Sequence, residues 1–213
     1  MAYYGIDKES YPGITAMKNF YNSGLFSYTG FYLPGTPFHS DTSFNAQARA
    51  DIASIGYGFM IYYVGRQTSS AATLKTRSQG AADAASAIAK AKACGFTRGI
   101  IYLDIEGDVK GDTAMLEYAA GFMVAFQDTA FQGGIYCSTT SANYLNSVPY
   151  VTRFIVARYD SSLNNTYSGI TPANSGISFA STWQYAGNVT KTFNGSTLKV
   201  DLNVSDYRNP SET

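Results

Sequence analysis

Eight short runs rich in isoleucine, valine, tyrosine and phenylalanine recur along the whole chain, and this repetition restricts the fold more than any other feature of the sequence. Each run has the length and composition of a β-strand. The predicted strands cover residues 3–7, 26–33, 58–65, 99–106, 133–139, 154–159, 177–185 and 198–205.

Between the first five predicted strands, apolar residues recur with the spacing of one helix face. Strands and helices that alternate in this way build a parallel sheet, and eight strands predict an α/β fold closed into a (β/α)8 barrel of the TIM type. Gly24, Gly56 and Gly95 follow three of these helices, where a left-handed residue closes a helix. The helical segments are marked by Ile14, Met17 and Phe20; by Phe44, Ala48, Ile52 and Ile55; by residues 79–94; and by Met115, Ala119, Phe122 and Phe126.

The last third of the chain is less regular than the rest. Segments 140–153 and 160–176 are rich in serine, asparagine, threonine and proline, so we expect short helices at most and a barrel that is flattened or irregular there. No linker or change of composition marks a second domain. We therefore expect residues 1–213 to form a single barrel domain.

The fourth predicted strand, GIIYLDIE at residues 99–106, carries two carboxylates in an apolar run. Side chains alternate between the two faces of a strand, so Tyr102, Asp104 and Glu106 share one face, and the isoleucines and leucine between them share the other. In a barrel the apolar face meets the helices, and the C-terminal strand ends form the active site. We predict that Asp104 and Glu106 lie at such a site.

Two further acids lie on the first and last predicted strands. Asp7 ends the first strand, and Asp201 shares a face with Asn203 on the last strand, which lies beside the first if the barrel closes. A loop amide or a helix cap explains any one of these acids alone. Several acids buried together destabilise a fold unless a site uses them. Arg158 either neutralises one of them or faces a helix.

The composition excludes several classes of function. Fifteen basic residues balance fifteen acidic ones, so the chain has no net positive charge that would attract nucleic acid. No apolar run of 18 residues predicts a membrane span. Eighteen tyrosines among few charges suit a neutral, hydroxyl-rich ligand, although tyrosines that fill a core explain most of them. Cys94 and Cys137 are too few for a disulfide framework, and we expect buried thiols.

The sequence also lacks the residues for several catalytic chemistries. The one histidine, His39, lies in the loop PGTPFHSD, where we expect it to be solvated, so neither a nucleophile–histidine set nor a zinc site of the usual type can be assembled. Calcium or magnesium binding is a rival interpretation of the acid cluster. Paired carboxyl groups suit hydrolysis of a glycosidic bond, in which one acid protonates the leaving oxygen.

The order of the motifs GID, YLDIE, WQYAG and VDLN resembles the family 25 glycoside hydrolases, the lysozyme-class muramidases. IYYVGRQ, QGAADAASAIAKAKACG, IYLDIEGD and GGIYCST, in this order, resemble more closely a related bacterial family of glycoside-hydrolase-like barrels of poorly known function. The resemblance covers roughly residues 3 to 207. The first predicted strand is followed by DKESYPG, which departs from the muramidase pattern and leaves the peptidoglycan substrate open.

The resemblance implies roles for the four acids. Glu106 is expected to be the general acid, Asp104 to stabilise positive charge or to position a substrate amide, and Asp7 and Asp201 to orient them. Alternation in the strand allows either Trp183 with Tyr185, or Gln184, to point into the cleft. The residues predicted to contact substrate are Tyr63, Tyr102, Tyr136, Arg158, Trp183, Gln184, Tyr185 and Asn203.

The leading functional hypothesis is a glycoside hydrolase of bacterial cell-wall glycan that needs no cofactor and no metal. The alternative hypothesis is a barrel that binds glycan without cleaving it, and a metal-dependent phosphoesterase ranks third. We expect a monomer in the cell wall, the periplasm or the extracellular space. The N-terminal residues MAYYGIDKES show no export signal, so that location requires another route or a leader already removed.

Overall fold

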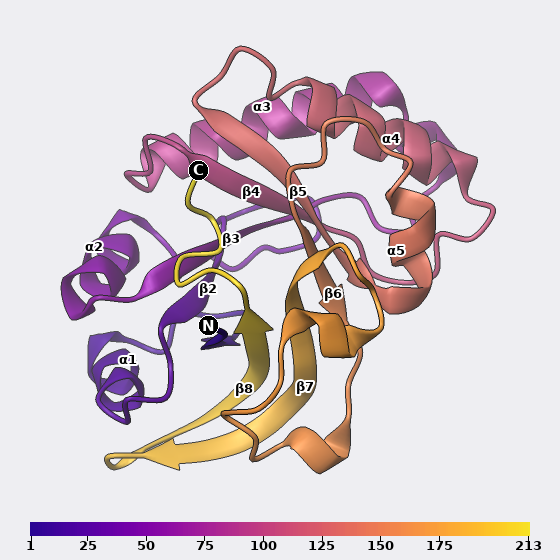
Figure 1. The fold of residues 1–213 in the computed structure, drawn as a ribbon. Coiled ribbons are helices and arrows are strands. Elements are labelled where there is room, and N and C mark those ends of the chain that lie inside the picture. The colour runs from indigo at the N-terminus through magenta and orange to yellow at the C-terminus, as the bar shows by residue number, and fades with distance from the viewer.

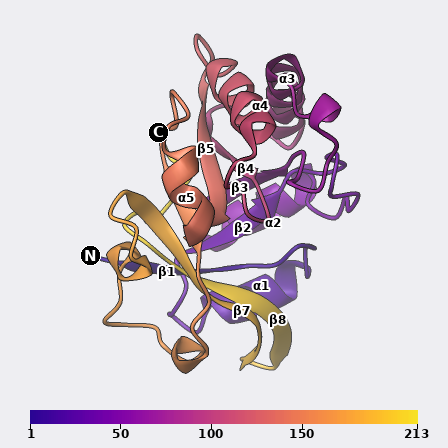
Figure 2. The ribbon, with the colours of Figure 1, turned by 90° about the vertical axis from the view of Figure 1, so that its right-hand side faces the viewer.

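The computed structural model describes all residues 1–213 as one closed eight-stranded barrel (Figures 1 and 2). The strands follow one another around the barrel in chain order. Their bounds are β1 Tyr3–Asp7, β2 Tyr28–Tyr32, β3 Gly58–Val64, β4 Gly99–Asp104, β5 Phe131–Ser138, β6 Phe154–Ala157, β7 Ala180–Phe193 and β8 Ser196–Ser205.

Helices fill the connections between the early strands, as the periodicity predicts. The helices are α1 Ile14–Tyr21, α2 Ala46–Ile55, α3 Arg77–Ala93, α4 Thr113–Val124 and α5 Thr139–Leu145, with 3-10 turns at Ala72–Leu74, Ser161–Leu163 and Pro172–Ser175. Gly24, Gly56 and Gly95 have positive φ angles of 74°, 104° and 91°, which confirms their predicted left-handed conformation. No α-helix follows α5, so the last third is irregular as expected. None of the helices combines the length and the hydrophobicity needed to cross a bilayer.

The last strand runs against both of its neighbours, which corrects the prediction of a fully parallel sheet. Strands β1 to β7 pair in parallel, whereas β8 is antiparallel to β7 and to β1. Only Asn194 and Gly195 join β7 to β8, and both have positive φ angles, 48° and 86°. A two-residue turn of this kind makes a hairpin, because a parallel connection needs about a dozen residues or more.

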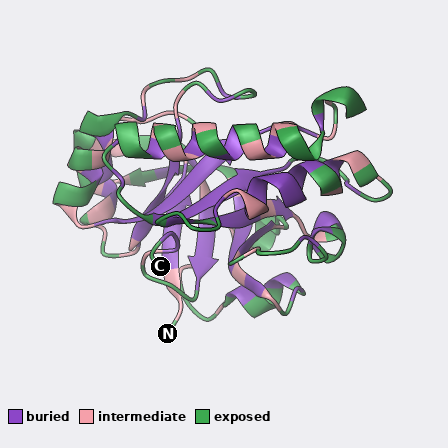
Figure 3. Cartoon of the chain, turned by 90° about the horizontal axis from the view of Figure 1, so that it is seen from above, coloured by how far each residue is buried: buried purple, intermediate pink, exposed green.

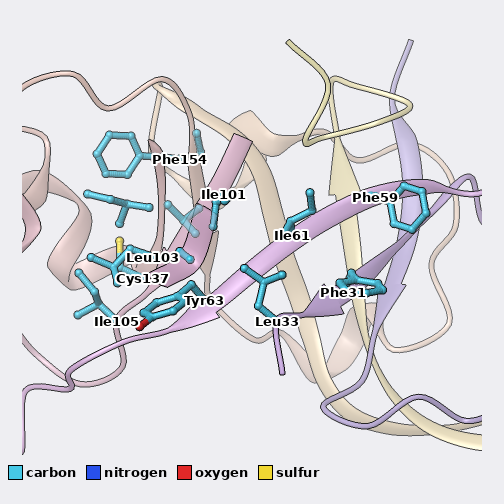
Figure 4. Close-up of a cluster of buried hydrophobic side chains, with 14 of the residues drawn as sticks. Phe31, Leu33, Phe59, Ile61, Tyr63, Ile101, Leu103, Ile105, Cys137 and Phe154 are labelled. Atoms are coloured by element: carbon cyan, nitrogen blue, oxygen red, sulfur yellow. The ribbon is translucent and has the colours of Figure 1, made fainter. Parts of the chain in front are cut away.

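Two apolar clusters stabilise the barrel. The larger one lies between the sheet and the helices, and Figure 4 shows part of it, including Phe31, Ile61 and Leu103. Figure 3 shows most of the strand residues buried, whereas the helices alternate between buried and exposed residues. The parts of β7 and β8 next to their connecting turn also contain exposed residues. Both free cysteines are buried, as predicted.

The smaller cluster fills the inside of the barrel and is rich in tyrosine. Its buried members are Tyr28, Met60, Tyr62, Ile100, Tyr102 and Ile155. Glycines make room for the rings: a Cβ atom on Gly5 would lie 2.2 Å from the Tyr28 ring, and one on Gly134 would lie 2.5 Å from the Tyr102 ring. The inside of the barrel is therefore packed below the strand ends, and a cleft opens only at its rim.

Candidate active site

A polar cleft of about 470 Å³ opens at the C-terminal ends of the parallel strands. It is the location at which barrels of this type place their active sites. The side chains that line it are Asp7, Lys8, Glu9, Tyr32, Phe38, His39, Val64, Gln67, Asp104, Glu106, Tyr136, Tyr159, Gln184, Asn188, Lys199, Val200 and Asp201. The structure thus brings the four predicted acids, Asp7, Asp104, Glu106 and Asp201, to one cleft.

Asp7 and Asp201 lie directly opposite each other, because β1 and β8 pair at these two residues. Asp7 accepts hydrogen bonds from Tyr32 (2.8 Å), Gln184 (2.9 Å) and Asn203 (2.7 Å). All three donors are uncharged, so no cation neutralises Asp7 directly.

Gln184 connects the two aspartates. Its amide nitrogen donates to Asp7 and to Asp201 (3.2 Å), and its amide oxygen accepts from Tyr136 (2.8 Å) and Tyr159 (3.0 Å). Both ends of the amide are thus engaged, and the amide is fixed in one orientation. This network shows that Gln184, rather than Trp183 or Tyr185, is the residue of the WQY motif that points inward.

Burial changes the proton affinity of the paired acids. Loss of solvation raises the pKa of Asp7, and the three hydrogen bonds oppose that rise. Burial and the charge of Asp7 raise the pKa of Asp201 to about 7, against the Asn188 amide and Lys199, which lower it. When two carboxyl groups lie this close, ionisation of one disfavours ionisation of the other. At neutral pH the pair therefore carries less than two full negative charges.

Asp104 ends β4 and is buried, with 5% of its surface exposed. Burial, followed by the charges of Glu106, Asp7 and Glu9, raises the pKa of Asp104 well above its usual range. Its Oδ1 atom has no hydrogen-bond partner in the protein. A buried polar atom without a hydrogen-bond partner is destabilising. Asp104 is therefore suited to form a hydrogen bond with a ligand in the cleft, either as acceptor or, when protonated, as donor.

Glu106 lies two residues beyond Asp104 and is exposed at the rim of the cleft. Gln67 positions this strand end through the backbone. Its amide nitrogen donates to the Asp104 carbonyl (2.9 Å), and its amide oxygen accepts from the Glu106 N–H (2.6 Å). Gln67 therefore continues the hydrogen-bonding pattern of the sheet past the last residue of β4.

His39 lines the cleft, which corrects the prediction that it is solvated. Only 3% of its surface is exposed, its Nδ1 atom lies 3.3 Å from Glu9, and its ring centroid lies 5.5 Å from that of Tyr32. The loop folds back over the strand ends, so a position between prolines and serines did not indicate exposure. Tyr32, Gln67 and Tyr159 were also absent from the predicted set, although each stands at or just beyond a predicted strand end.

Of the eight residues predicted to contact substrate, only Tyr136 and Gln184 line this cleft. Asn203 is buried beneath the cleft and donates a hydrogen bond to Asp7. Tyr102 lies deeper in the barrel, where its hydroxyl donates to the Pro210 carbonyl (2.7 Å). Tyr102 and Tyr136 lie on the same face of the sheet but at different depths in the barrel. The alternation of side chains along a strand predicts the face and not the depth.

The other four residues lie outside the acidic cleft. Figure 4 shows Tyr63 among the apolar side chains on the helix-facing side, where its ring packs on Phe122. Trp183 and Tyr185 belong to the same outer core. Arg158 is exposed and lies 5.3 Å from the Trp183 ring, so it does not neutralise the acid cluster. Both faces of these strands are buried, so the hydrophobic pattern does not distinguish inside from outside.

No group of three or more histidine, cysteine, aspartate or glutamate side chains in the structure is arranged to hold a metal ion. The cleft instead offers carboxyl groups of different solvation: Asp7, Asp104 and Asp201 are withdrawn from water, whereas Glu9 and Glu106 are open to it. Such a set suits acid–base chemistry on a neutral polar ligand.

A sequence model described as "Rv2525c-like, glycoside hydrolase-like domain" matches residues 18–205. No curated protein matches the chain in sequence. Three solved structures illustrate the shared fold. An uncharacterised protein of B. stearothermophilus has a TM-score of 0.70 at 16% identity, with 97% of each chain covered. The Tat-secreted protein Rv2525c of Mycobacterium tuberculosis has a TM-score of 0.66 at 15% identity, over 99% of this chain and 97% of that one. The spore cortex lytic enzyme SleM of Clostridium perfringens has a TM-score of 0.66 at 14% identity, over 96% and 67%.

Proposed function

This chain belongs to the family of Rv2525c-like, glycoside hydrolase-like domains, and we propose that it is a glycoside hydrolase that cleaves bacterial cell-wall glycan. The observation that carries the proposal is the convergence of Asp7, Asp104, Glu106 and Asp201 on one cleft. No direct ion pair to a lysine or arginine neutralises these acids. A fold retains such a destabilising cluster most readily where catalysis uses it.

Glu106 is the proposed general acid. It is exposed at the rim, so a glycosidic oxygen can approach it without rearrangement of the barrel. The backbone on its N-terminal side is fixed by Gln67, which limits the positions that the carboxyl group can take. General-acid catalysis needs a proton donor held within hydrogen-bonding distance of the leaving oxygen, and Glu106 meets the positional part of that requirement.

The three withdrawn acids support the reaction in different ways. Asp104 has an unpartnered oxygen, which we assign to a polar hydrogen of the substrate, such as a sugar amide N–H. Asp7 and Asp201 share negative charge beside the cleft and stabilise the positive charge that develops on the sugar ring during cleavage.

The cell-wall substrate is proposed from the relatives. SleM is described as a spore cortex lytic enzyme, and the endolysin ply40, from a bacteriophage of Listeria monocytogenes, has the same fold at a TM-score of 0.66 and 17% identity. Rv2525c is described as Tat-secreted, which supports a location outside the cytoplasm for this protein as well. At these identities the likeness itself concerns the fold.

The experiment compares wild type with Glu106→Gln on purified bacterial peptidoglycan and measures the release of reducing ends. The exposed side chain makes this variant compatible with the fold, and we expect a loss of about 100-fold or more, the usual contribution of general-acid catalysis. Glu117→Gln is the matched control, because Glu117 is an exposed acid on α4 outside the cleft. Equal release by wild type and Glu106→Gln would contradict the proposal. Binding to peptidoglycan without release, unchanged in Glu106→Gln, would identify a glycan-binding barrel instead.

A further inference from the structure

A second cavity of about 240 Å³ adjoins the acidic cleft on the other side of Glu106. Glu106, Tyr136 and Tyr159 line both cavities, so the two cavities adjoin at these residues. The second cavity is otherwise lined by Ile105, Gly107, Ser138, Ala157 and Arg158. The proposed acid therefore lies at a junction, with space for a sugar unit on each side of it.

The two cavities differ in charge. Asp7, Glu9, Asp104 and Asp201 line the first cavity in addition to Glu106, with Lys8 and Lys199 as its only lysines and no arginine. The second cavity has Glu106 and Arg158 as its only ionisable groups besides the two tyrosines. An anionic substituent of a bound glycan is therefore repelled more strongly from the first cavity than from the second, where the positive charge of Arg158 offsets the negative charge of Glu106.

Arg158 is held in place but has no ionic partner. Its guanidinium group lies 5.3 Å from the centroid of the Trp183 ring, and its Nη2 atom donates to the Asn174 carbonyl (2.6 Å). No carboxylate of the protein forms an ion pair with it. A guanidinium group that is oriented by its neighbours and keeps free N–H donors is suited to a carboxylate, which it can bind through two parallel hydrogen bonds.

We propose that the second cavity is a subsite for a sugar that carries a carboxylate, with Arg158 as the group that recognises it and the scissile linkage above Glu106. This inference rests on the proposed glycosidase function and narrows its substrate to glycans with acidic substituents, such as a lactyl ether or a peptide attached through one. The neutral neighbouring sugar occupies the acidic cleft. Arg158 is thus a specificity-determining residue rather than a member of the acid cluster.

The test measures binding in the Glu106→Gln background by isothermal titration calorimetry, so that no ligand is cleaved. The probes are the tetrasaccharide of alternating N-acetylglucosamine and N-acetylmuramic acid with free carboxylates, and the same tetrasaccharide with its carboxyl groups reduced to alcohols. We expect the carboxylate form to bind about tenfold more tightly, in line with one charge-assisted, bidentate contact. Arg158→Gln should remove that preference and leave the affinity for the reduced form unchanged.

Arg153→Gln is the matched control. Arg153 also lies over an aromatic ring, 3.5 Å from the centroid of Tyr207, and also donates to a backbone carbonyl, that of Pro210 (2.8 Å). It precedes β6 and therefore lies at the opposite end of the barrel from the cleft. Thermal unfolding of both variants reports whether either one fails to fold, and Arg158→Lys, which retains the charge without the fork of donors, should keep part of the preference.

Equal affinity for the two tetrasaccharides, no binding of either, or an equal loss on both in Arg158→Gln would overturn the subsite. These outcomes are distinct from failure of the proposed function. If wild type still releases reducing ends through Glu106, the hydrolase stands and only the subsite fails. If wild type cleaves nothing while the preference depends on Arg158, the subsite stands and the hydrolase fails.

Discussion

At the scale of single residues, the unusual property of the site is that only uncharged groups bind the paired acids Asp7 and Asp201. Asp7 is bound by a tyrosine and two amides, and Asp201 by a backbone N–H and one of the same amides. Amides and hydroxyls stabilise a carboxylate through hydrogen bonds but do not cancel its charge. The charge of Asp7 therefore acts on Asp201 and contributes to the raised pKa of Asp201.

That raised pKa predicts how stability depends on pH. Between about pH 4, the usual pKa of an aspartate, and about pH 7, Asp201 keeps its proton in the folded state and loses it in the unfolded state, so stability falls as pH rises through this window. Asp201→Asn removes the contribution of this carboxyl group, while those of Asp7 and Asp104 remain. At pH 8 we expect the variant to be more stable than wild type by on the order of 2 kcal/mol, a value reduced for the partial exposure of the carboxyl group.

Thermal unfolding at pH 4 and pH 8 measures this effect. The unfolding temperature of Asp201→Asn should exceed that of wild type by roughly 4–8 °C at pH 8 and match it at pH 4. Asp206→Asn is the control, because Asp206 is an exposed acid just after β8. A difference of the same size at both pH values would show that the substitution acts through packing rather than through titration.

The sequence predicted the positions of the four acids better than those of the aromatic side chains. An acid at the end of an apolar strand is most easily accommodated at the rim of the barrel, where a cleft reaches it. The predicted positions of Asp7 and Asp104 at the rim were therefore correct. Trp183 and Tyr185 are as hydrophobic as residues of either face, and β7 is buried on both sides over this segment. Only contacts made by other strands determine that Gln184 is the inward residue.

At the scale of elements, the loop after β3 determines the shape of the end of β4. Gln67 stands three residues past β3 and binds the backbone of Asp104 and Glu106 in the same way as a neighbouring strand residue. The preceding residue fixes the loop to the helices, since the Arg66 N–H donates to the Tyr118 hydroxyl (3.1 Å) and the Arg66 side chain lies 3.4 Å from Asp83. The position of the proposed acid thus depends on α3 and α4.

Gln67→Met tests this dependence, because methionine has a similar length but neither donates to Asp104 nor accepts strongly from Glu106. Without the Gln67 amide, the backbone groups of Asp104 and Glu106 lose their hydrogen-bond partner. The free energy of local opening at this strand end should fall by about 1–3 kcal/mol. We expect amide hydrogen exchange at Glu106 to become at least roughly tenfold faster and kcat on peptidoglycan to fall more than KM changes. Gln47→Met, on the exposed face of α2, is the control. Unchanged exchange at Glu106 would show that the clamp is not needed to order the strand end.

The order and type of most elements followed from the sequence, and the direction of the last strand did not. Apolar periodicity identified each strand and the main helices, because every one of them has a face against the core. For the last strand, the alternation of the earlier units suggested a parallel partner. The Asn194–Gly195 pair between two strand-forming runs was the local signal for a hairpin, and that local signal decides the direction.

At the scale of the whole molecule, the barrel has one open end and one closed end. The acidic cleft forms the open end, while the segment after β8 crosses the opposite end beneath β3 and β4. Asn209 accepts from the Phe59 N–H (2.9 Å), and Ser211 accepts from Ile61 through its hydroxyl (2.8 Å) and from Ile100 through its carbonyl (2.8 Å). This segment completes the hydrogen bonding at the beginning of β3 and β4, where these two strands are not yet paired with each other. No pattern in the sequence marks it.

Ser211→Ala should therefore destabilise the whole barrel without altering the cleft. The substitution leaves the buried Ile61 N–H without its partner, at a cost of about 1–3 kcal/mol, and the unfolding temperature should fall by several degrees. Glu212→Ala, one residue further along and exposed, is the matched control and should change nothing. Well below the unfolding transition, the Ser211→Ala variant should bind the carboxylated tetrasaccharide in the Glu106→Gln background as its parent does, because the two ends of the barrel are separated by the tyrosine-rich inner cluster. If binding falls together with stability, the closed end also controls the geometry of the cleft. The inner cluster then transmits structural changes from one end of the barrel to the other.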